Sequence, residues 1–309
     1  MEYDVIIIGG GPAAAGAAVY VARKKLRGLL IAESFGGQSI VSADVQNWIG
    51  TKSVSGLDLA KNLETHIRNY PEDLEIKSSE TATKVSKKDD GFLVETDKGG
   101  AYVSRAVIYC AGARRRKLGI PGEVEFDGKG VAYCSTCDAP LFGGRDVAVV
   151  GGGNAGLEAV ADLLPYAIKI YLLEYTEALK GDPVTQEHIK NSEKVKIILS
   201  AQTKEVKGEK FVTGLIYKDR VSGEDITLPV GGVFVEIGSV PNSEPVKDLV
   251  ALNTYGEIVI DHKTAATSCE GIWAAGDVTD EMYKQNNISA GDGVKAALST
   301  YQYLLAKNQ

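Results

Sequence analysis

The sequence lacks the features that mark membrane-bound, secreted and nucleic-acid-binding proteins. It has no apolar run near the ~18 residues that span a membrane, and the apolar segment 5–8 lacks the charged flank and cleavage site of a secretory signal. It has no excess of basic charge, because 34 Lys and Arg stand against 41 Asp and Glu, for a formal net charge of -7. Nucleic-acid binding needs clustered positive charge to neutralise phosphates. We therefore expect a cytoplasmic protein without nucleic-acid or membrane partners.

Cysteine is also scarce, with four residues in 309. This number does not make the disulfide framework of a small secreted domain. Two of the four are spaced as CSTC at 134–137, a pattern typical of a redox pair or of half a zinc site. A second Cys-x-x-Cys is missing and His66, His188 and His262 are scattered, which favours a redox role for Cys134 and Cys137. Cys110 and Cys269 are predicted to be packing residues.

The sequence does contain a repeated pattern of strand, glycine-rich turn and helix. The first copy runs from the apolar strand 4–8 through GGGPAA at 9–14 into an alanine-rich helix that ends near residue 23. The second runs from the strand 146–150 through GGGNAG at 151–156 into the helical segment 157–164 and another strand at 168–173. Units of this kind bind dinucleotides, so two copies predict two dinucleotides.

The glycine turns have the composition that a bound pyrophosphate requires. A pyrophosphate binds against backbone N–H groups at a helix N-terminus, where side chains must be small or absent. Gly9, Gly11 and Ala14 satisfy this requirement in the first copy. An acidic residue ends the next strand of each copy, Glu33 in the first and Glu174 in the second, and its carboxylate can accept hydrogen bonds from ribose hydroxyls.

Glu174 also bears on the electron donor. A carboxylate at this position repels the 2'-phosphate of NADPH, and YTEA at 175–178 supplies no arginine to bind one. Lys180 is the nearest cation in the sequence. We therefore expect NADH as the donor, with NADPH less favoured.

Two other features each allow two interpretations. Asp138, directly after the cysteine pair, is either a proton shuttle to the departing thiolate or an acidic residue favoured by the helix dipole. The basic run RRRK at 114–117 is either a solvated linker or a docking patch for an acidic partner.

The remaining segments complete two domains of α/β class. The segment 93–111 is predicted as strands broken by DKGG at 97–100, a hairpin signal. Strand-like segments at 195–199, 214–217 and 232–237 precede GIWAAGD at 271–277 and a final helix over about 293–305. We predict two Rossmann-like dinucleotide-binding domains with the second inserted into the first. The outer domain would comprise residues 1–113 and 244–309, and the inserted domain residues 114–243 with the cysteine pair.

Together these motifs resemble those of the low-molecular-weight thioredoxin reductases over essentially the whole chain. GGGPAA at 9–14, GGQ at 36–38, NW at 47–48, GIWAAGD at 271–277 and YKQ at 283–285 stand in the family's order. LLE at 172–174, AQT at 201–203 and DRVSG at 219–223 are more similar to the reductase portion of the flavoprotein component of alkyl hydroperoxide reductase, which uses NADH. That component has an N-terminal thioredoxin-like module, which we do not expect in this chain. The chain departs from the family pattern at CAG 110–112 and DAP 138–140.

The resemblance implies a fold and a division of roles. It implies three-layer ββα domains, with FAD in the outer domain and NAD(P)H in the inserted one. Cys137 would face the flavin, Cys134 would attack a partner disulfide, and Asp138 would act as acid and base. Asp277 and Gln285 would hold the ribityl chain and ring of FAD. The partner would be a thioredoxin-like or glutaredoxin-like protein, and the family forms homodimers whose inserted domain rotates.

The predicted cofactor-binding residues follow from the turns and from the resemblance. For FAD they are Gly9, Gly11, Pro12, Ala13, Ala14, Glu33, Gly37, Gln38, Asn47, Gly112, Gly276, Asp277, Lys284, Gln285 and Asn286. For NAD they are Gly151, Gly153, Asn154, Ala155, Gly156, Glu174 and Gly238.

Two other functions compete with an NADH-dependent disulfide reductase. A flavin dithiol oxidase would deliver electrons to oxygen, but such an enzyme needs no nicotinamide site, and the turn at 151–156 predicts one. A non-catalytic nucleotide-sensing or scaffolding module needs no cysteine pair. A disulfide reductase uses both features, and it is the function that we predict.

Overall fold

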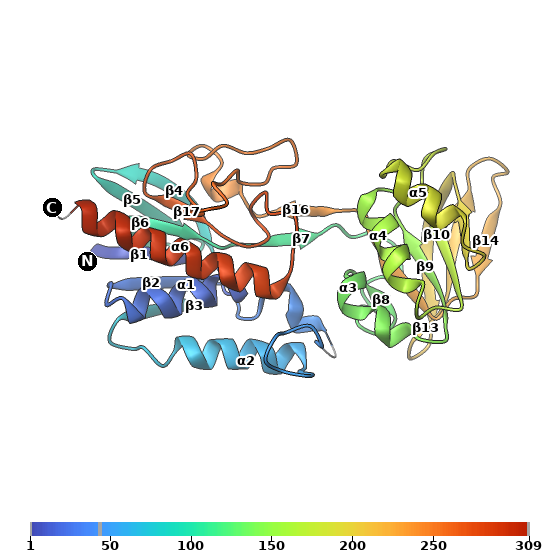
Figure 1. Ribbon diagram of the computed structural model, residues 1–309, viewed down its shortest axis with the longest axis horizontal. Helices are drawn as coiled ribbons and strands as arrows, with labels where there is room; N and C mark the ends of the chain where they lie inside the picture. The colour runs from blue at the N-terminus through green and yellow to red at the C-terminus, as the bar shows by residue number, and fades with distance from the viewer. Residues whose placement is uncertain (1, 43–44, 308–309) are drawn as a thin grey trace. The chain divides into compact units, whose positions relative to one another are not determined.

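The computed structural model describes residues 2–42 and 45–307, which divide into two compact units. Unit 1 is Met1–Arg114 with Val240–Gln309, and unit 2 is Arg115–Ser239. The predicted boundaries, after residue 113 and before residue 244, are close to these divisions. Both divisions fall inside short strands, β7 (Ala113–Arg115) and β16 (Ser239–Pro241), which pair with each other. Each unit has its own sheet and helices (Figure 1).

Unit 1 is built on a seven-stranded sheet in the order β3-β2-β1-β6-β5-β4, with β17 also paired to β6. The parallel strands are β1 (Glu2–Ile8), β2 (Gly28–Ala32), β3 (Leu74–Ser78), β6 (Ala101–Tyr109) and β17 (Ile272–Ala274). The antiparallel strands are β4 (Ala82–Lys88) and β5 (Gly91–Thr96). The first half of β6 pairs with β5 and its last three residues pair with β17, so one strand joins the parallel and antiparallel parts.

Both faces of the second half of strand β1 are buried, which explains the unbroken apolar run at 5–8. Val5 and Ile7 contribute to one hydrophobic cluster, and Ile6 and Ile8 contribute to another. Successive side chains of a strand point to opposite faces of the sheet, so a strand covered on both sides needs apolar residues at every position.

Helices α1 (Pro12–Arg23) and α6 (Asn286–Lys307) lie side by side on unit 1 (Figure 1), and α2 (Gly56–Ile67) follows the short 3₁₀ helix η1 (Gly37–Val41). Two glycines permit the close approach of α1 and α6. A side chain at Gly16 would collide with the carbonyl oxygen of Ala290, and one at Gly293 would collide with that of Ala13. A second 3₁₀ helix, η3, spans Glu244–Val246.

Unit 2 contains a parallel sheet in the order β11-β10-β9-β15-β8. Its strands are β8 (Val131–Ala132), β9 (Asp146–Val150), β10 (Lys169–Leu173), β11 (Val195–Ile198) and β15 (Gly232–Val235). The strands β12 (Ala201–Gly208), β13 (Val212–Asp219) and β14 (Asp225–Leu228) form an antiparallel sheet. The helices are α3 (Ser135–Asp138), the 3₁₀ helix η2 (Ala139–Phe142), α4 (Asn154–Leu163) and α5 (Pro183–Lys190).

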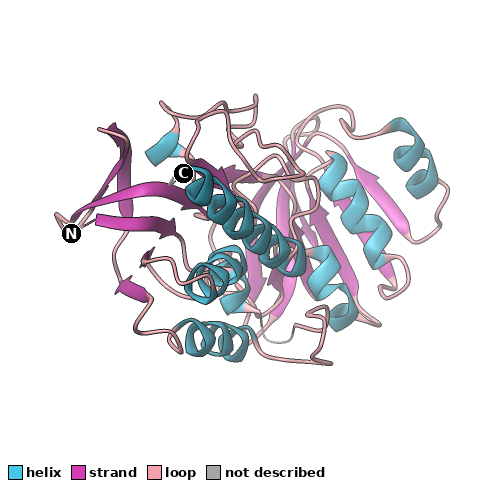
Figure 2. Ribbon diagram, turned by 60° about the vertical axis from the view of Figure 1, so that its left-hand side comes forward, coloured by secondary structure: helices cyan, strands magenta, loops and turns pink. Residues whose placement is uncertain are grey.

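The predicted α/β class with two Rossmann-like units is confirmed (Figure 2, helices cyan and strands magenta). The last helix begins at Asn286, earlier than the predicted 293, because its first turns are polar and lack the apolar periodicity on which the prediction rested. The helix after Cys134 is a single turn, and Pro140 lies within the 3₁₀ turn that follows it. Among the described residues, no helix is both long and apolar enough to cross a membrane.

Candidate functional site

Unit 1 contains a cavity of about 390 Å³ at the carboxyl ends of its parallel strands. Ile8 of β1, Ile31 of β2 and Tyr109 of β6 line its inner end. This is the position at which open α/β sheets bind ligands, and the volume falls in the range of cofactor sites. All the predicted FAD residues line this cavity except Ala14 and Asn47. Ala14 is completely buried in the core beside α1, where a small side chain permits close packing of helix and strand.

The first glycine turn fits a bound pyrophosphate. Gly9 has φ +129°, and a side chain there would collide with the carbonyl oxygen of Cys110, so the fold itself requires glycine. Gly11 has an ordinary φ of -82°, and a Cβ there would approach only the Cα of Gly37, at 3.7 Å. Packing within the protein therefore does not require glycine at position 11. A ligand that lies against the backbone at the start of α1 would require it, because a side chain there would collide with the ligand.

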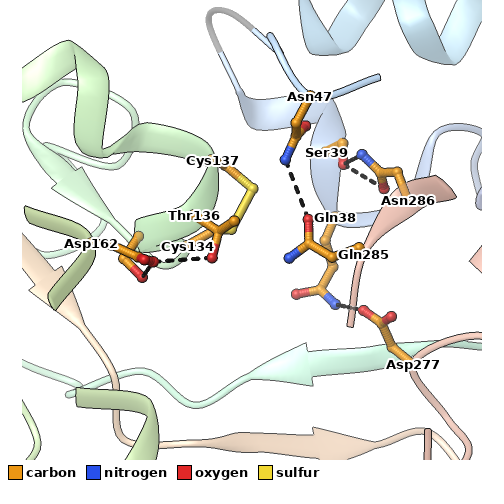
Figure 3. Close-up of a disulfide and its surroundings, with 11 residues drawn as sticks. Gln38, Ser39, Asn47, Cys134, Thr136, Cys137, Asp162, Asp277, Gln285 and Asn286 are labelled. Carbon is orange, nitrogen blue, oxygen red and sulfur yellow. Dashed lines mark hydrogen bonds between the residues drawn. A yellow bond between two sulfur atoms is a disulfide. The ribbon is translucent and has the colours of Figure 1, made fainter. Parts of the chain in front are cut away.

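Polar side chains of distant segments meet around this cavity (Figure 3). The amide of Gln38 donates to Asp277 at 3.2 Å, and the Ser289 hydroxyl donates to the other oxygen of the same carboxylate at 3.2 Å. The amide of Asn47 donates to Gln285 at 3.2 Å, so Asn47 contacts a residue of the cavity wall without lining the cavity. The pairs Gln38–Asp277 and Asn47–Gln285 are more than 230 positions apart, and the sequence predicted these four side chains only through the family resemblance. Ser289 was not predicted.

The second glycine turn has the same backbone geometry. Gly151 has φ +120°, and a side chain there would collide with the carbonyl oxygen of Glu236. At Gly153 a Cβ would meet no protein atom within 4 Å, and at Gly156 it would collide with the carbonyl oxygen of Gly151. Gly153 is thus the counterpart of Gly11: open toward solvent and not required by packing. Gly238, with φ +92°, is equally open.

Two of the predicted nucleotide-binding side chains bond to the protein itself. Asn154 accepts a hydrogen bond from the backbone of Asp182 at 2.7 Å, which ties the start of α4 to the start of α5. Glu174 is 7% exposed and accepts from the backbone of Gly152 at 2.7 Å and from Thr176. Burial alone would raise the pKa of the Glu174 carboxyl, but the hydrogen bonds from Thr176 and Gly152 outweigh it, and the pKa is lowered. Glu174 is therefore ionised at neutral pH. Ala155 follows, exposed, in the first turn of α4.

An arginine that sequence spacing did not reveal contacts the residue that follows Glu174. The guanidinium of Arg220 stacks over the ring of Tyr175 at 4.2 Å, and its Nη1 donates to the Tyr175 carbonyl at 2.9 Å. Arg220 belongs to the turn between β13 and β14, 45 positions from Tyr175. The segment 175–178 has no arginine of its own, but the fold supplies one from elsewhere.

The cysteine pair is a disulfide in unit 2, with 5.3 Å between the two Cα atoms. Cys134 is the N-cap of α3, and Cys137 lies within that helical turn. The free cysteines Cys110 and Cys269 are buried, and burial raises the pKa of both thiols, which suits packing residues. The described residues contain no group of three or more His, Cys, Asp or Glu side chains that could hold a metal ion.

Asp138 has the properties of a residue that can exchange a proton near neutral pH. Burial, with a smaller contribution from the charge of Asp127, raises its pKa to about 6. Its backbone N–H donates to the carbonyl of Cys134 at 3.0 Å, which holds it in the same turn as the disulfide.

Two acidic residues that were not predicted support this turn. Asp162 of α4 accepts from the hydroxyls of Ser135 at 2.9 Å and Thr136 at 3.1 Å (Figure 3). Glu123 accepts from the hydroxyl of Tyr133 at 3.0 Å. Glu236, which directly follows β15, is another buried acid, and burial raises its pKa to about 7. Only Glu236 carried a signal in the sequence, as a lone carboxylate in the apolar run VFVEI at 233–237.

Comparisons with known proteins agree with this geometry. A family model described as "Pyridine nucleotide-disulphide oxidoreductase" matches residues 3–293. The chain is 45% identical over 303 residues to a Bacillus subtilis (strain 168) protein named NADH dehydrogenase. It is 44% identical over 303 residues to a Staphylococcus aureus (strain MRSA252) protein named as a subunit of alkyl hydroperoxide reductase. Each alignment covers 98% of this chain and 59% of the relative, so the chain spans under two thirds of the length of these relatives.

Two solved structures are similar over nearly the whole chain. Thioredoxin reductase from Streptococcus pyogenes MGAS5005 matches with a TM-score of 0.91 and 32% identity, covering 99% of both chains. Thioredoxin reductase from Giardia duodenalis matches with a TM-score of 0.91 and 28% identity, covering 98% of this chain and 99% of that one. These similarities confirm the resemblance to thioredoxin reductases and to the alkyl hydroperoxide reductase flavoprotein.

Proposed function

Because the chain belongs to the pyridine nucleotide-disulphide oxidoreductase family, we propose that it is an FAD-dependent reductase that passes electrons from NADH to the Cys134–Cys137 disulfide and then to a protein disulfide. One observation carries this proposal: the disulfide begins a helical turn that also contains Asp138, in the unit that holds the GGGNAG turn. A nucleotide-binding turn and a redox pair in one unit suit an enzyme that both accepts and delivers electrons.

Unit 1 is the proposed FAD domain. The N–H groups at the start of α1 would bind the pyrophosphate against Gly11, and Glu33 would accept from the ribose hydroxyls. Asp277, which Gln38 and Ser289 hold, and Gln285, which Asn47 holds, would bind the ribityl chain and ring. The flavin would supply the chemistry that the side chains lack, which is to accept two electrons as hydride and deliver them to a disulfide.

Unit 2 is the proposed NAD(P)H domain. Gly153 leaves the start of α4 open to a second pyrophosphate, and Glu174 presents a negative charge beside that turn. A negative charge there opposes the 2'-phosphate of NADPH, which supports NADH as the donor. The name of the Bacillus subtilis relative, NADH dehydrogenase, agrees with this choice.

The cysteines and Asp138 would divide the thiol chemistry. When the S–S bond breaks, one sulfur leaves as a thiolate, and Asp138 would hold the proton that this thiolate takes up. The thiolate of Cys134 would attack the partner's disulfide, and Cys137 would then attack Cys134 and release the reduced partner. We propose a thioredoxin-like or glutaredoxin-like partner, a cytoplasmic location and a homodimer on the family resemblance.

Anaerobic titration of the FAD-loaded protein with NADH and then NADPH tests this function. NADH should bleach the flavin, and the protein should then consume a second equivalent as the disulfide is reduced. If neither nucleotide bleaches the flavin but a dithiol does, the protein is a dithiol oxidase. A protein that is colourless and does not take up added FAD would contradict the proposal as a whole.

A further inference from the structure

The two residues between the cysteines are both bonded to one carboxylate, that of Asp162. The hydroxyl of Ser135 donates to Oδ2 of Asp162 at 2.9 Å, and the hydroxyl of Thr136 donates to the same oxygen at 3.1 Å (Figure 3). Ser135 is only 7% exposed, and a buried hydroxyl needs a hydrogen-bond partner. Hydrogen bonds to a carboxylate are also stronger than those between neutral groups. We call these two contacts the Asp162 clamp.

The helix that carries Asp162 is itself fixed by the core of unit 2. Leu157 and Val160 of α4 are completely buried. They belong to a hydrophobic cluster that also contains Ala139 and Phe142 of η2, the 3₁₀ helix that follows the cysteine pair. The core therefore holds the segment after the pair, and the clamp holds the two residues inside it.

We infer that Asp162 is a positioning residue that keeps the two cysteine thiols close to each other and so makes the disulfide harder to reduce. Reduction breaks the bond between Cys134 and Cys137 but removes neither the two hydroxyls nor their acceptor. While the clamp holds the backbone between them, the two sulfurs stay near each other after reduction. Bond formation between groups held close together is favoured over bond formation between groups that can separate. Loss of the clamp should therefore shift the equilibrium toward the dithiol.

The inference rests on the redox role proposed for the cysteine pair, but its test needs neither NADH nor a protein partner. Dithiothreitol transfers two electrons and two protons to the pair, so the protein gains two thiols while dithiothreitol closes its own disulfide. Anaerobic mixtures of reduced and oxidised dithiothreitol set the equilibrium. Alkylation with N-ethylmaleimide and mass spectrometry of the peptide that contains both cysteines then count the thiols, whatever the state of the flavin. If NADH does not reduce the pair, the proposed function fails, but this equilibrium can still be measured.

The decisive comparison is the FAD-loaded wild-type chain against Asp162→Ala. The Ala variant should be half reduced at about a three- to tenfold lower ratio of reduced to oxidised dithiothreitol, and a tenfold change corresponds to about 30 mV. Asp162→Asn keeps an amide oxygen that can accept from both hydroxyls, so it should stay close to the wild type. Glu158→Ala, at an exposed acid of the same helix, is the matched control and should leave the equilibrium unchanged.

A double-mutant cycle tests whether the two hydroxyls are the cause. Ser135→Ala combined with Thr136→Val removes both donors and keeps Asp162. This double variant should shift the equilibrium by about as much as Asp162→Ala does. Addition of Asp162→Ala to the double variant should give no further shift, because the three residues act through the same contacts.

Three outcomes would overturn the inference. The first is an unchanged equilibrium in Asp162→Ala, and the second is a set of shifts that add when all three substitutions are combined. The third is a shift in Asp162→Asn as large as that in Asp162→Ala, which would indicate an effect of charge rather than of hydrogen bonds. If Asp162→Ala does not fold, the double variant at Ser135 and Thr136 decides the question, and an unchanged equilibrium in it contradicts the inference.

Discussion

At the scale of single residues, Asp138 is the clearest case in which burial changes the pKa of a side chain that could take part in the reaction. Its pKa is raised to about 6, so the protonated acid is present below that pH and is lost as the pH rises through it. If Asp138 is the proton donor, the rate of disulfide reduction should fall as the pH rises through about 6, which gives the pH–rate profile a declining limb. Asp138→Asn should lower disulfide reduction by about 10²-fold or more, remove that limb, and leave flavin reduction by NADH unchanged. Steady-state and stopped-flow assays measure the two steps separately.

The same residue makes a prediction for stability with a definite sign. The folded pKa of Asp138 lies above its ordinary value of 3.8, so the fold favours the protonated form. Its contribution to stability is complete below about pH 4 and is lost as the pH rises through about 6. Asp138→Asn should therefore be more stable than the wild type at pH 8, by about 3 kcal/mol at most, and equal to it near pH 4. Urea unfolding at both pH values, with Asp225→Asn as an exposed control, measures the difference.

We also expect individual side chains to decide the choice between NADH and NADPH. Glu174→Gln removes a charge but keeps the size, and it should narrow the NADH preference; a tenfold change corresponds to about 1.4 kcal/mol. Arg220→Ala should lower kcat/KM for NADPH more than for NADH, because Arg220 is the cation that the fold brings to Tyr175. Equal losses with both donors in both variants would refute a role for these charges in discrimination. Thermal unfolding checks that Glu174→Gln retains its turn.

At the scale of elements, the two glycine turns provide controls for each other. Gly11 and Gly153 are open positions where the fold tolerates a side chain and a bound pyrophosphate does not. Gly11→Glu should abolish FAD binding, so the protein is colourless but folded. Gly153→Glu should stay yellow and lose reduction by NADH. Absorbance and circular dichroism of both variants test this, and FAD retention in Gly11→Glu would contradict the assignment of unit 1.

The elements that could be predicted from sequence are those in which local pattern and tertiary environment agree. Strands β1 and β9 are apolar at nearly every position because both faces are buried, and glycine turns follow them. The start of α6 could not be predicted, because its polar residues Asn286 and Asn287 are held by hydrogen bonds to Ser39 and to the backbone of Asn47 rather than by apolar periodicity. Arg220 and Asp162 were missed for a related reason. Their partners are tens of residues away, and no local spacing records a contact made by sheet topology.

At the scale of the whole molecule, the proposed electron path needs both units. The two cysteine sulfurs carry out its last steps, and each has a different role. One must be reachable by a protein substrate and the other must receive electrons, and the resemblance assigns these tasks to Cys134 and Cys137 respectively. Both are partly exposed in the disulfide that begins α3. Substitution of each in turn should therefore stop turnover at a different step.

Cys134→Ser should still allow flavin reduction by NADH but should reduce no disulfide partner, because the attacking thiol is gone. Cys137→Ser should instead trap the partner on Cys134 as a stable mixed disulfide, since no second thiol remains to release it. Mass spectrometry of the trapped species, with the double serine variant as the control, would identify the partner. If Cys134→Ser keeps full activity toward a thioredoxin-like protein, or if the trap forms on Cys137 in Cys134→Ser rather than on Cys134, the assignment of the two sulfurs is reversed or wrong.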